Sequence, residues 1–212
     1  MENIYISKNS LKRLPFYIDY LKKRKALGDV FISSTAIAKG LGLNDVQVRK
    51  DLALVSQTGG KPKVGYEIDE LLRDMDTFLG VKNINQTILV GVGSLGEALV
   101  RYEGFDEYGL AIKGALDNNP SKIGAKIHDV EIMSVDKIKD FCKEHDIHIG
   151  IITVPLKYAQ ETADILIESG VKAIWNFAPT TLSVPNDILV QNENMASSLA
   201  ILSRHLNLKM KK

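Results

Sequence analysis

The sequence predicts an α/β Rossmann fold, with a doubly wound and mostly parallel sheet, behind an N-terminal winged helix-turn-helix domain. From residue 87 onward, short apolar runs alternate with amphipathic segments, as they do in parallel sheets that helices cover on both faces. A GxGxxG run over residues 91–96 separates the first apolar run from the helical pattern after it. Residues 1–66 carry instead three short helical patterns and a glycine-rich basic turn. These three observations predict the order of the two folds.

The distribution of charge supports this division of the 212 residues. Residues 1–66 carry 12 Lys/Arg against 5 Asp/Glu, and residues 67–212 carry 15 against 21, so the parts have net charges of +7 and −6. A basic part of this kind favours a nucleic-acid partner, although a solvated basic face gives the same count. We expect a winged-helix domain over residues 1–80, a Rossmann domain over residues 81–193 and a C-terminal helix over residues 194–212.

Composition also indicates the compartment. Hydrophobic residues make up 45% of the chain and charged residues 25%, as in ordinary globular proteins. No apolar run approaches the roughly 18 residues of a membrane span, and the start Met1–Ile4 lacks the pattern of a secretory signal. Cys142 is the only cysteine, so neither an internal disulfide nor a cysteine metal site is expected. We predict a cytoplasmic protein with no membrane contact and no metal.

Four helices are expected in the first domain. The first spans residues 10–27, with Pro15 in its first turns, where a missing N–H is tolerated. Residues 59–63 read as a turn, and residues 67–79 as an amphipathic fourth helix. The caps expected for the second and third helices are Ser34 or Thr35, and Asn44 or Asp45. The side chains expected to face inward are Leu11, Leu14, Ile18 and Leu21 in the first helix, Ala36, Ile37, Ala38 and Leu41 in the second, and Val46, Val48, Leu52 and Val55 in the third.

The second domain is expected to alternate strands and helices. The predicted strands span residues 87–92, 110–116, 130–133, 148–153, 171–175 and 187–190. The predicted helices span residues 94–102, 135–144, 157–168 and 195–207.

The glycine-rich run has the context that a dinucleotide-binding fingerprint requires. It reads Gly91-Val92-Gly93-Ser94-Leu95-Gly96, directly after a buried-strand pattern and directly before a helix. Gly91 allows a tight turn, Gly93 lets the pyrophosphate approach the backbone, and Gly96 lets the helix pack on the strand. The sequence therefore predicts a bound dinucleotide, and the alternative is a Rossmann fold that has lost its ligand.

An acidic residue ends the second strand of this domain. Asp117 is placed to accept hydrogen bonds from the adenosine ribose and to disfavour a 2′-phosphate, so NAD(H) is predicted in preference to NADP(H). Asn118 follows it toward the same ligand. The alternative is that Asp117 only begins the Asn118-Asn119-Pro120 turn.

The third helix carries side chains suited to reading DNA. Gln47, Arg49 and Lys50 lie on its polar side. Glutamine pairs with adenine and arginine with guanine in the major groove, whereas lysine mostly holds phosphate. Lys61 and Lys63 lie on the turn that forms the wing. The alternative is a small helical dimerisation module with a solvated basic helix.

Taken together, the motifs resemble the Rex family of redox-sensing transcriptional repressors over nearly the whole chain, in the family's order. The matching words are Arg13-Leu14-Pro15, Val48-Arg49-Lys50-Asp51-Leu52, Val64-Gly65-Tyr66, Gly91-Val92-Gly93-Ser94-Leu95-Gly96, Tyr102 with Gly104-Phe105, Ile123-Gly124, Thr153-Val154-Pro155 and Asn176-Phe177-Ala178-Pro179.

The resemblance implies a homodimer that binds palindromic operator DNA, with a C-terminal helix, here about Met195 to Leu206, swapped onto the partner. It implies that NADH closes the dimer and releases DNA, whereas NAD⁺ permits binding. The candidate DNA-binding residues are Arg13, Ser34, Gln47, Arg49, Lys50, Lys61, Lys63 and Tyr66. The candidate cofactor-binding residues are Gly91, Val92, Gly93, Ser94, Leu95, Gly96, Tyr102, Asp117, Asn118, Thr153, Val154, Pro155, Asn176, Phe177, Ala178 and Met195. Of these, Tyr102, Phe177 and Ala178 are expected on the nicotinamide side.

The chain departs from the family pattern at three places. Residues 55–60 replace a Phe-Gly-x-Phe-Gly segment, Asp19 stands where the family often has arginine, and Asn194-Met195 replaces Asp-Phe. With Asp19 and Asn194 the family's interdomain ion pair cannot form, and Met195 is apolar but does not stack as a ring does. These departures indicate a divergent branch with altered coupling or ligand preference.

Two other functions compete with this interpretation. A Rossmann oxidoreductase needs an acid or base over the nicotinamide, and none of the four histidines, His128, His145, His148 and His205, is well placed for that role. We therefore do not expect an enzyme. A regulator that senses another nucleotide or an acyl-CoA through the same fold is the second alternative, because fold does not fix the ligand.

Overall fold

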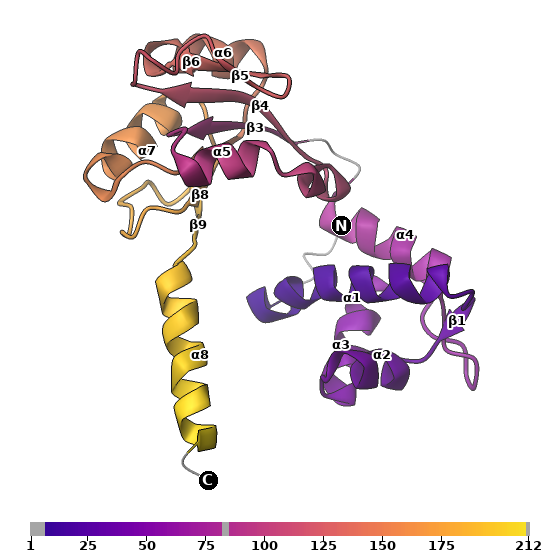
Figure 1. Cartoon of the computed structure of the whole chain (residues 1–212). Coiled ribbons are helices and arrows are strands. Elements are labelled where there is room, and N and C mark those ends of the chain that lie inside the picture. The colour runs from indigo at the N-terminus through magenta and orange to yellow at the C-terminus, as the bar shows by residue number, and fades with distance from the viewer. Residues whose placement is uncertain (1–6, 82–84, 211–212) are drawn as a thin grey trace. The chain divides into compact units, whose positions relative to one another are not determined.

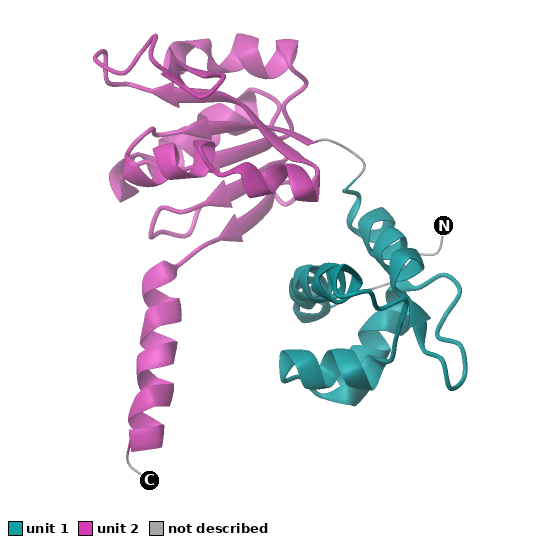
Figure 2. Ribbon diagram, turned by 45° about the vertical axis from the view of Figure 1, so that its right-hand side comes forward, with its two compact units in different colours: residues 1–83 teal, residues 84–212 magenta. Residues whose placement is uncertain are grey.

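The computed structural model describes residues 7–81 and 85–210. The start Met1–Ile4, on which the expectation about a secretory signal rests, lies outside the described residues. The chain forms two compact units, residues 1–83 and residues 84–212 (Figure 2).

The described residues of unit 1 form four helices and a small antiparallel ribbon. The helices are α1 (Lys8–Ala26), α2 (Ser34–Leu41), α3 (Asp45–Val55) and α4 (Ile68–Leu79), and the strands are β1 (Phe31–Ile32) and β2 (Tyr66–Glu67). Ser7, Ser33 and Asn44 begin the first three helices, and each side chain accepts a hydrogen bond from a backbone N–H of the first turn. The second cap is therefore Ser33, one residue before the two that the sequence pattern favoured.

The core of unit 1 is formed by the inner faces of all four helices. It includes Leu14, Ile37, Leu52, Leu71 and Met75, each almost completely buried. Because apolar residues recur at helical spacing in every element, the unit buries one continuous cluster despite its size.

Three further details of unit 1 differ from the sequence prediction. Leu11, expected to face inward, is 37% exposed. Pro15 is the eighth residue of α1, past the first turns, because the helix begins at Lys8, two residues before the predicted start. Val46 is 56% exposed rather than inward. It lies about 200° around the helix from Val48, and Val48 belongs with Leu52 to the buried stripe.

Unit 2 is built on a seven-stranded sheet. The strands are β3 (Asn85–Val90), β4 (Leu110–Asp117), β5 (Lys126–Ile127), β6 (Val130–Ser134), β7 (Ile149–Ile152), β8 (Ala173–Asn176) and β9 (Leu189–Asn192). Their order is β5-β6-β4-β3-β7-β8-β9, and all neighbours are parallel except the β5–β6 pair (Figure 1). Without β5, this is the doubly wound order in which the chain reverses direction between β3 and β7. The predicted fold class is confirmed.

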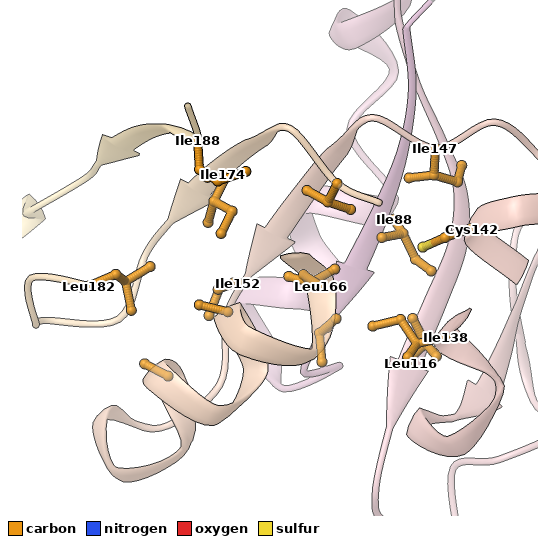
Figure 3. Packing of buried hydrophobic residues seen from close by; sticks show 14 of the residues in the cluster. Ile88, Leu116, Ile138, Cys142, Ile147, Ile152, Leu166, Ile174, Leu182 and Ile188 are labelled. Carbon is orange, nitrogen blue, oxygen red and sulfur yellow. The ribbon is translucent and has the colours of Figure 1, made fainter. Parts of the chain in front are cut away.

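Helices cover both faces of this sheet. They are α5 (Ser94–Val100), α6 (Ile138–Glu144) and α7 (Ala159–Glu168), with short 3-10 turns η1 (Glu103–Tyr108), η2 (Val135–Lys137) and η3 (Leu156–Tyr158). Successive residues of β3 alternate between the faces. Ile88 packs in the cluster with α6 and α7 (Figure 3), and Leu89 packs in the cluster that α5 covers.

Several strand boundaries are shifted from the expected ones. The first strand ends at Val90, not at residue 92, because Gly91 turns the chain with a φ of 99°. The last two strands begin two residues later than expected. Strand β5 was not expected, because two residues are too short to show alternation.

The last helix is α8 (Met195–Met210). Asn194 caps it by accepting the backbone N–H of Ser197 at 2.9 Å. None of its residues is buried, although Leu199, Leu202 and Leu206 are large and apolar. Among the helices that the structure describes, none is both long enough and apolar enough to cross a membrane.

Candidate functional site

A cleft opens in unit 2 at the carboxyl ends of β3 and β7, where the chain reverses direction. Ligands of open α/β sheets bind at this point, because the crossovers on the two sides leave a crevice. The cleft has a volume of about 760 Å³, within the range of ordinary small-molecule sites. Its lining residues are Val90, Gly91, Gly93, Asp117, Asn118, Asn119, Lys122, Val135, Thr153, Val154, Pro155, Tyr158, Glu161, Thr162 and Ile165.

The three glycines of the fingerprint have different surroundings. A Cβ on Gly91 would lie 2.9 Å from the backbone of Thr153, and one on Gly96 would lie 2.2 Å from the carbonyl oxygen of Gly91. These two glycines are required by the packing of the turn itself. A Cβ on Gly93 would meet nothing within 4 Å. Gly93 is thus dispensable for the fold, and the open space above it faces the cleft.

Thr153 fixes the turn from the neighbouring strand. Its hydroxyl donates to the carbonyl of Gly91 at 2.7 Å and to that of Val90 at 3.1 Å, and its own backbone N–H also reaches Val90. The carbonyls at the end of β3 are therefore satisfied internally. These three hydrogen bonds join the end of β3 to the start of the loop after β7.

Asp117 and Lys122 hold the peptides on either side of Val92. Oδ2 of Asp117 accepts the N–H of Val92 at 2.8 Å, and Oδ1 accepts that of Asn119 at 2.8 Å. Nζ of Lys122 donates to the carbonyl of Val92 at 2.5 Å and lies 3.7 Å from Oδ2 of Asp117. Asp117 is buried at the end of β4. Each carboxylate oxygen has a second lone pair, so both can still accept from a hydroxyl group in the cleft.

The cleft gathers part of the predicted cofactor-binding set and adds residues to it. The predicted residues that line it are Gly91, Gly93, Asp117, Asn118, Thr153, Val154 and Pro155. Those that do not are Val92, Ser94, Leu95, Gly96, Tyr102, Asn176, Phe177, Ala178 and Met195. Lys122 and Glu161 are polar residues in the lining that sequence reasoning missed. The nearest sequence signal for Lys122 is the Asn-Asn-Pro turn, which folds the chain back toward Asp117.

A row of aromatic rings leads from the end of α5 to the end of β8. Tyr102 contacts Phe105 at 4.9 Å between centroids, Phe105 contacts Trp175 at 5.8 Å, and Trp175 contacts Phe177 at 4.5 Å. Phe177 packs with the cluster on the α5 face of the sheet, whereas Ala178 is buried in the cluster on the other face. Phe177 and Ala178, both expected on the nicotinamide side, thus pack in clusters on opposite faces of the sheet.

Asn176 organises the loop that follows β8. It is fully buried, and its amide nitrogen donates to the carbonyls of Ala178 and Thr180 and to the side chain of Asn192. Its amide oxygen accepts the N–H of Ala178 at 3.0 Å. Both ends of the amide are therefore engaged within the protein, so Asn176 acts through the shape of the loop.

The groups considered for catalysis lie elsewhere. None of the four histidines lines the cleft. His148 directly precedes β7, at the amino end of the sheet, and His128 lies in the turn between β5 and β6. Cys142 is buried on α6, and burial raises the pKa of its thiol to about 11. It is therefore a packed and protonated thiol at neutral pH.

Unit 1 has a separate cavity between α3 and the turn that precedes β2. Its volume is about 330 Å³. Five predicted DNA-binding residues line it, namely Ser34, Arg49, Lys61, Lys63 and Tyr66. Three basic side chains thus gather around one concave surface, which suits a phosphate backbone.

The wing has a defined geometry. Lys61 forms an antiparallel bridge with Gly65, and Lys63 between them has a left-handed φ of 64°. A Cβ on Gly65 would lie 2.4 Å from the carbonyl oxygen of Ile32. Glycine is therefore needed where the wing crosses β1.

The exposed side of α3 carries the other candidates for DNA contact. Gln47, Arg49 and Lys50 are all exposed. Arg49 pairs with Asp45 at 2.7 Å, and Asp45 also accepts from the Ser34 hydroxyl at 3.3 Å. The pair links the start of α2 to α3 and restrains the direction of Arg49.

Arg13 is partly exposed and is held by a residue of α3. Its guanidinium donates to both oxygens of the buried Asp51, at 2.7 and 3.0 Å. The hydrogen bond to Asp51 is the largest effect that raises the pKa of Arg13. Arg13 thus joins α1 to α3, and its predicted contact with DNA stays a prediction.

Comparisons with known proteins match the two units separately. A family model described as a CoA binding domain matches residues 82–180, and a model described as the N-terminus of a putative DNA-binding protein matches residues 5–53. The first match covers much of unit 2, and the second lies within unit 1.

Known proteins and solved structures also match nearly the whole length of the chain. The chain is 40% identical over 198 residues to the redox-sensing transcriptional repressor Rex of Bacteroides fragilis, covering 93% of this chain and 90% of that protein. It is 42% identical over 200 residues to that of Treponema denticola, covering 94% and 95%. The crystal structure of RSP with β-NAD⁺ and operator DNA superposes with a TM-score of 0.90 at 36% identity, covering 98% of this chain and 95% of that one. RSP with β-NADH superposes with a TM-score of 0.87 at 37% identity, covering 98% and 97%.

Proposed function

The chain belongs to the Rex family of redox-sensing transcriptional repressors, and on that basis we propose that it binds operator DNA and releases it when NADH binds. The observation that carries this proposal is that one chain holds both sites. Unit 1 has a basic concave surface beside α3. Unit 2 has open space above Gly93, at the point where the strand order of the sheet reverses. RSP, which spans 98% of this chain, holds β-NAD⁺ and operator DNA together.

The dinucleotide that best fits the cleft is NAD(H). In this proposal the pyrophosphate lies over Gly93, and the adenosine ribose donates to the carboxylate of Asp117. A 2′-phosphate would meet the negative charge of Asp117, which disfavours NADP(H). Lys122 donates a hydrogen bond to the carbonyl of Val92 in the glycine turn and would add a positive charge beside the pyrophosphate. Asn118, Thr153, Val154 and Pro155 would complete this half of the site.

The nicotinamide half is proposed to use the aromatic row. The oxidised ring is a cation and the reduced ring is neutral, so an apolar environment penalises NAD⁺ by desolvation. Tyr102 and Phe177 stand at the two ends of the row. Met195 at the start of α8 would cap the ring without stacking on it. A ligand shifts the equilibrium between two dimer arrangements only by its difference in affinity for them.

We propose that α8 packs against a second copy of the chain. Leu199, Leu202 and Leu206 form one stripe, and Ile201 and Leu208 are exposed on other sides. A helix that is apolar around much of its circumference is normally buried. We infer a homodimer in which α8 packs on the partner's Rossmann domain, so that two copies of unit 1 face a palindromic operator. We propose a cytoplasmic location, in keeping with DNA as the proposed target.

Catalysis is not part of this proposal. The relatives named above are repressors, and no histidine lines the cleft. The carboxylates that line the cleft are those of Asp117 and Glu161. Asp117 is already held by two backbone N–H groups, which suits binding rather than proton transfer.

Operator binding with and without ligand tests the function. At fixed salt, NADH should weaken operator affinity by about 5- to 150-fold, the usual range of coupling between two sites. NAD⁺ should have a smaller effect. CoA is the informative comparison, because the family model on unit 2 describes CoA binding. Release by CoA but not by NADH would replace the proposed ligand, and release by neither would remove the coupling.

The wing lysines Lys61 and Lys63 should contribute equally to the affinity for every DNA sequence, because phosphates are the same in all of them. Lys61→Met with Lys63→Asn removes two exposed charges, and asparagine tolerates the left-handed φ at position 63. Because lysines that neutralise phosphates release counterions, the slope of log affinity against log salt should become shallower by about 0.9 for each phosphate that is no longer neutralised. The measurement is operator affinity at four or five salt concentrations. An unchanged slope would place the wing away from the phosphates.

A further inference from the structure

A buried carboxylate lies directly beneath the proposed DNA-reading face of α3. Asp51 is 1% exposed and receives hydrogen bonds from two helices. From α1, the hydroxyl of Tyr17 donates to Oδ2 at 2.7 Å, beside the two bonds from Arg13. From α3 itself, Nε2 of Gln47 donates to Oδ1 at 3.2 Å. Buried carboxylates are rare unless they are fully paired.

The charge state of Asp51 follows from these contacts. Burial acts to raise the pKa of Asp51, but hydrogen bonds from Arg13, Tyr17 and Ser10 outweigh it, and the pKa is lowered overall. Burial raises the pKa of Tyr17 to about 12, and the hydrogen bond from Tyr17 to Asp51 is the second largest cause of this rise. At neutral pH, therefore, Asp51 is an anion and Tyr17 is a neutral donor. An ionised carboxylate can only accept hydrogen bonds.

This constraint fixes which way the Gln47 amide points. Only the NH₂ end of the amide can face a carboxylate, so Oε1 is directed away from Asp51. Nε2 carries an inner hydrogen, on the same side of the C–N bond as Oε1, and an outer hydrogen on the opposite side. Donation through the inner hydrogen would bring Oε1 toward the carboxylate, and the two negative oxygens would repel each other. The outer hydrogen is therefore the donor, and Oε1 and the inner N–H form the free edge. That edge, one acceptor beside one donor, is the one that pairs with N6 and N7 of adenine.

We propose that Asp51 is a positioning residue for base recognition, which holds the amide of Gln47 in the orientation that selects adenine. This inference rests on the proposed function, because it requires that α3 enters the major groove. Arg13 and Tyr17 then serve recognition from α1 without touching DNA. Without the carboxylate, the amide rotates, and its reversed edge no longer matches adenine.

The experiment compares operators in which each base pair of the half-site is replaced in turn. The wild-type protein should prefer adenine at one position, and a good bidentate pair gives about 5- to 150-fold discrimination. Asp51→Asn should reduce that preference at least about fivefold, because asparagine can face either end of the Gln47 amide. Discrimination at other positions and the salt slope should stay as in the wild type.

Two further variants separate positioning from folding. Tyr17→Phe keeps the ring and the Asp51 carboxylate but removes one hydrogen bond that holds it, so a smaller loss at the same position is expected. This variant tests the proposal even if Asp51→Asn fails to fold. In Gln47→Ala the preference is already gone, and adding Asp51→Asn should cause no further loss of discrimination. A fresh loss in that background would overturn the proposal.

Asp74 supplies the matched control. It is a second buried carboxylate of unit 1, and it accepts the backbone N–H of Gln57 at 2.9 Å. Asp74→Asn should lower thermal stability without changing base preference. If Asp51→Asn behaves like Asp74→Asn and weakens all operators equally, Asp51 is only structural and the inference fails. A wild-type protein without base preference would instead refute the proposed function.

Arg13 distinguishes the two roles considered for it. Arg13→Gln should weaken adenine preference as Tyr17→Phe does, and it should leave the salt slope unchanged. A slope shallower by about 0.9 would mean that Arg13 contacts a phosphate. That result would return it to the DNA surface and overturn this part of the inference.

Discussion

Gly93→Val is expected to abolish dinucleotide binding while leaving the fold intact. A Cβ at this position meets nothing within 4 Å, and its φ of −80° suits any residue. The branched side chain would instead fill the space proposed for the pyrophosphate. A steric cost of about 3 kcal/mol corresponds to a loss of affinity of at least about 100-fold. Titration with NADH, followed by fluorescence, measures the affinity, and thermal unfolding without ligand measures the fold.

Gly96→Ala is the matched control for this prediction. Its Cβ would lie 2.2 Å from the carbonyl oxygen of Gly91, so the turn itself must move. We expect a lower unfolding temperature in the absence of ligand, which Gly93→Val does not show. If Gly93→Val binds NADH with wild-type affinity, the pyrophosphate does not lie over this turn.

Placing charges on α8 is expected to separate the dimer and with it operator binding. Leu199→Glu with Leu202→Glu removes two leucines from the stripe of each copy, and full burial of a leucine is worth about 1.5 to 3 kcal/mol. Four such losses in a two-fold dimer, about 6 to 12 kcal/mol, approach the affinity of a whole nanomolar complex. Light scattering at micromolar concentration should then find monomers, and affinity for a palindromic operator should fall at least about 100-fold.

The control for α8 is Asn207→Glu, which adds one charge to the same helix outside the leucine stripe. It should leave a dimer with normal operator affinity. A double leucine variant that remains dimeric would mean that α8 is covered by another surface. Retained operator affinity in a proven monomer would mean that the two DNA-binding units do not depend on α8.

The sequence predicted the fold class and the place of the cleft because these follow from local patterns. Apolar runs such as Ile149–Ile152 mark strands covered on both faces, and the glycine run marks the turn after the first of them. Conversely, β5 was missed because it depends on pairing with β6 across a turn. The exposed Val46 shows a similar limit, since only the neighbouring helices determine which stripe of α3 is inward.

The roles of individual side chains were harder to predict, because they depend on contacts between distant residues. Arg13 has the chemistry of a phosphate ligand, and nothing near it in the sequence shows that Asp51, 38 residues later, holds it. Asn176 ends β8 directly before a loop that fits a ligand site, yet its amide is engaged by that loop and by β9. Lys122 was missed for the same reason, because its partner Val92 lies 30 residues earlier.

The aromatic row also gives the molecule an optical property. Trp175 is the only tryptophan of the chain, and it stands between Phe105 and Phe177 within the row. Reduced nicotinamide absorbs light in the range in which indole emits. A nicotinamide held at this row would therefore accept excitation energy from a single fixed donor, and the emission of the native protein would follow the redox state of its ligand without any added dye.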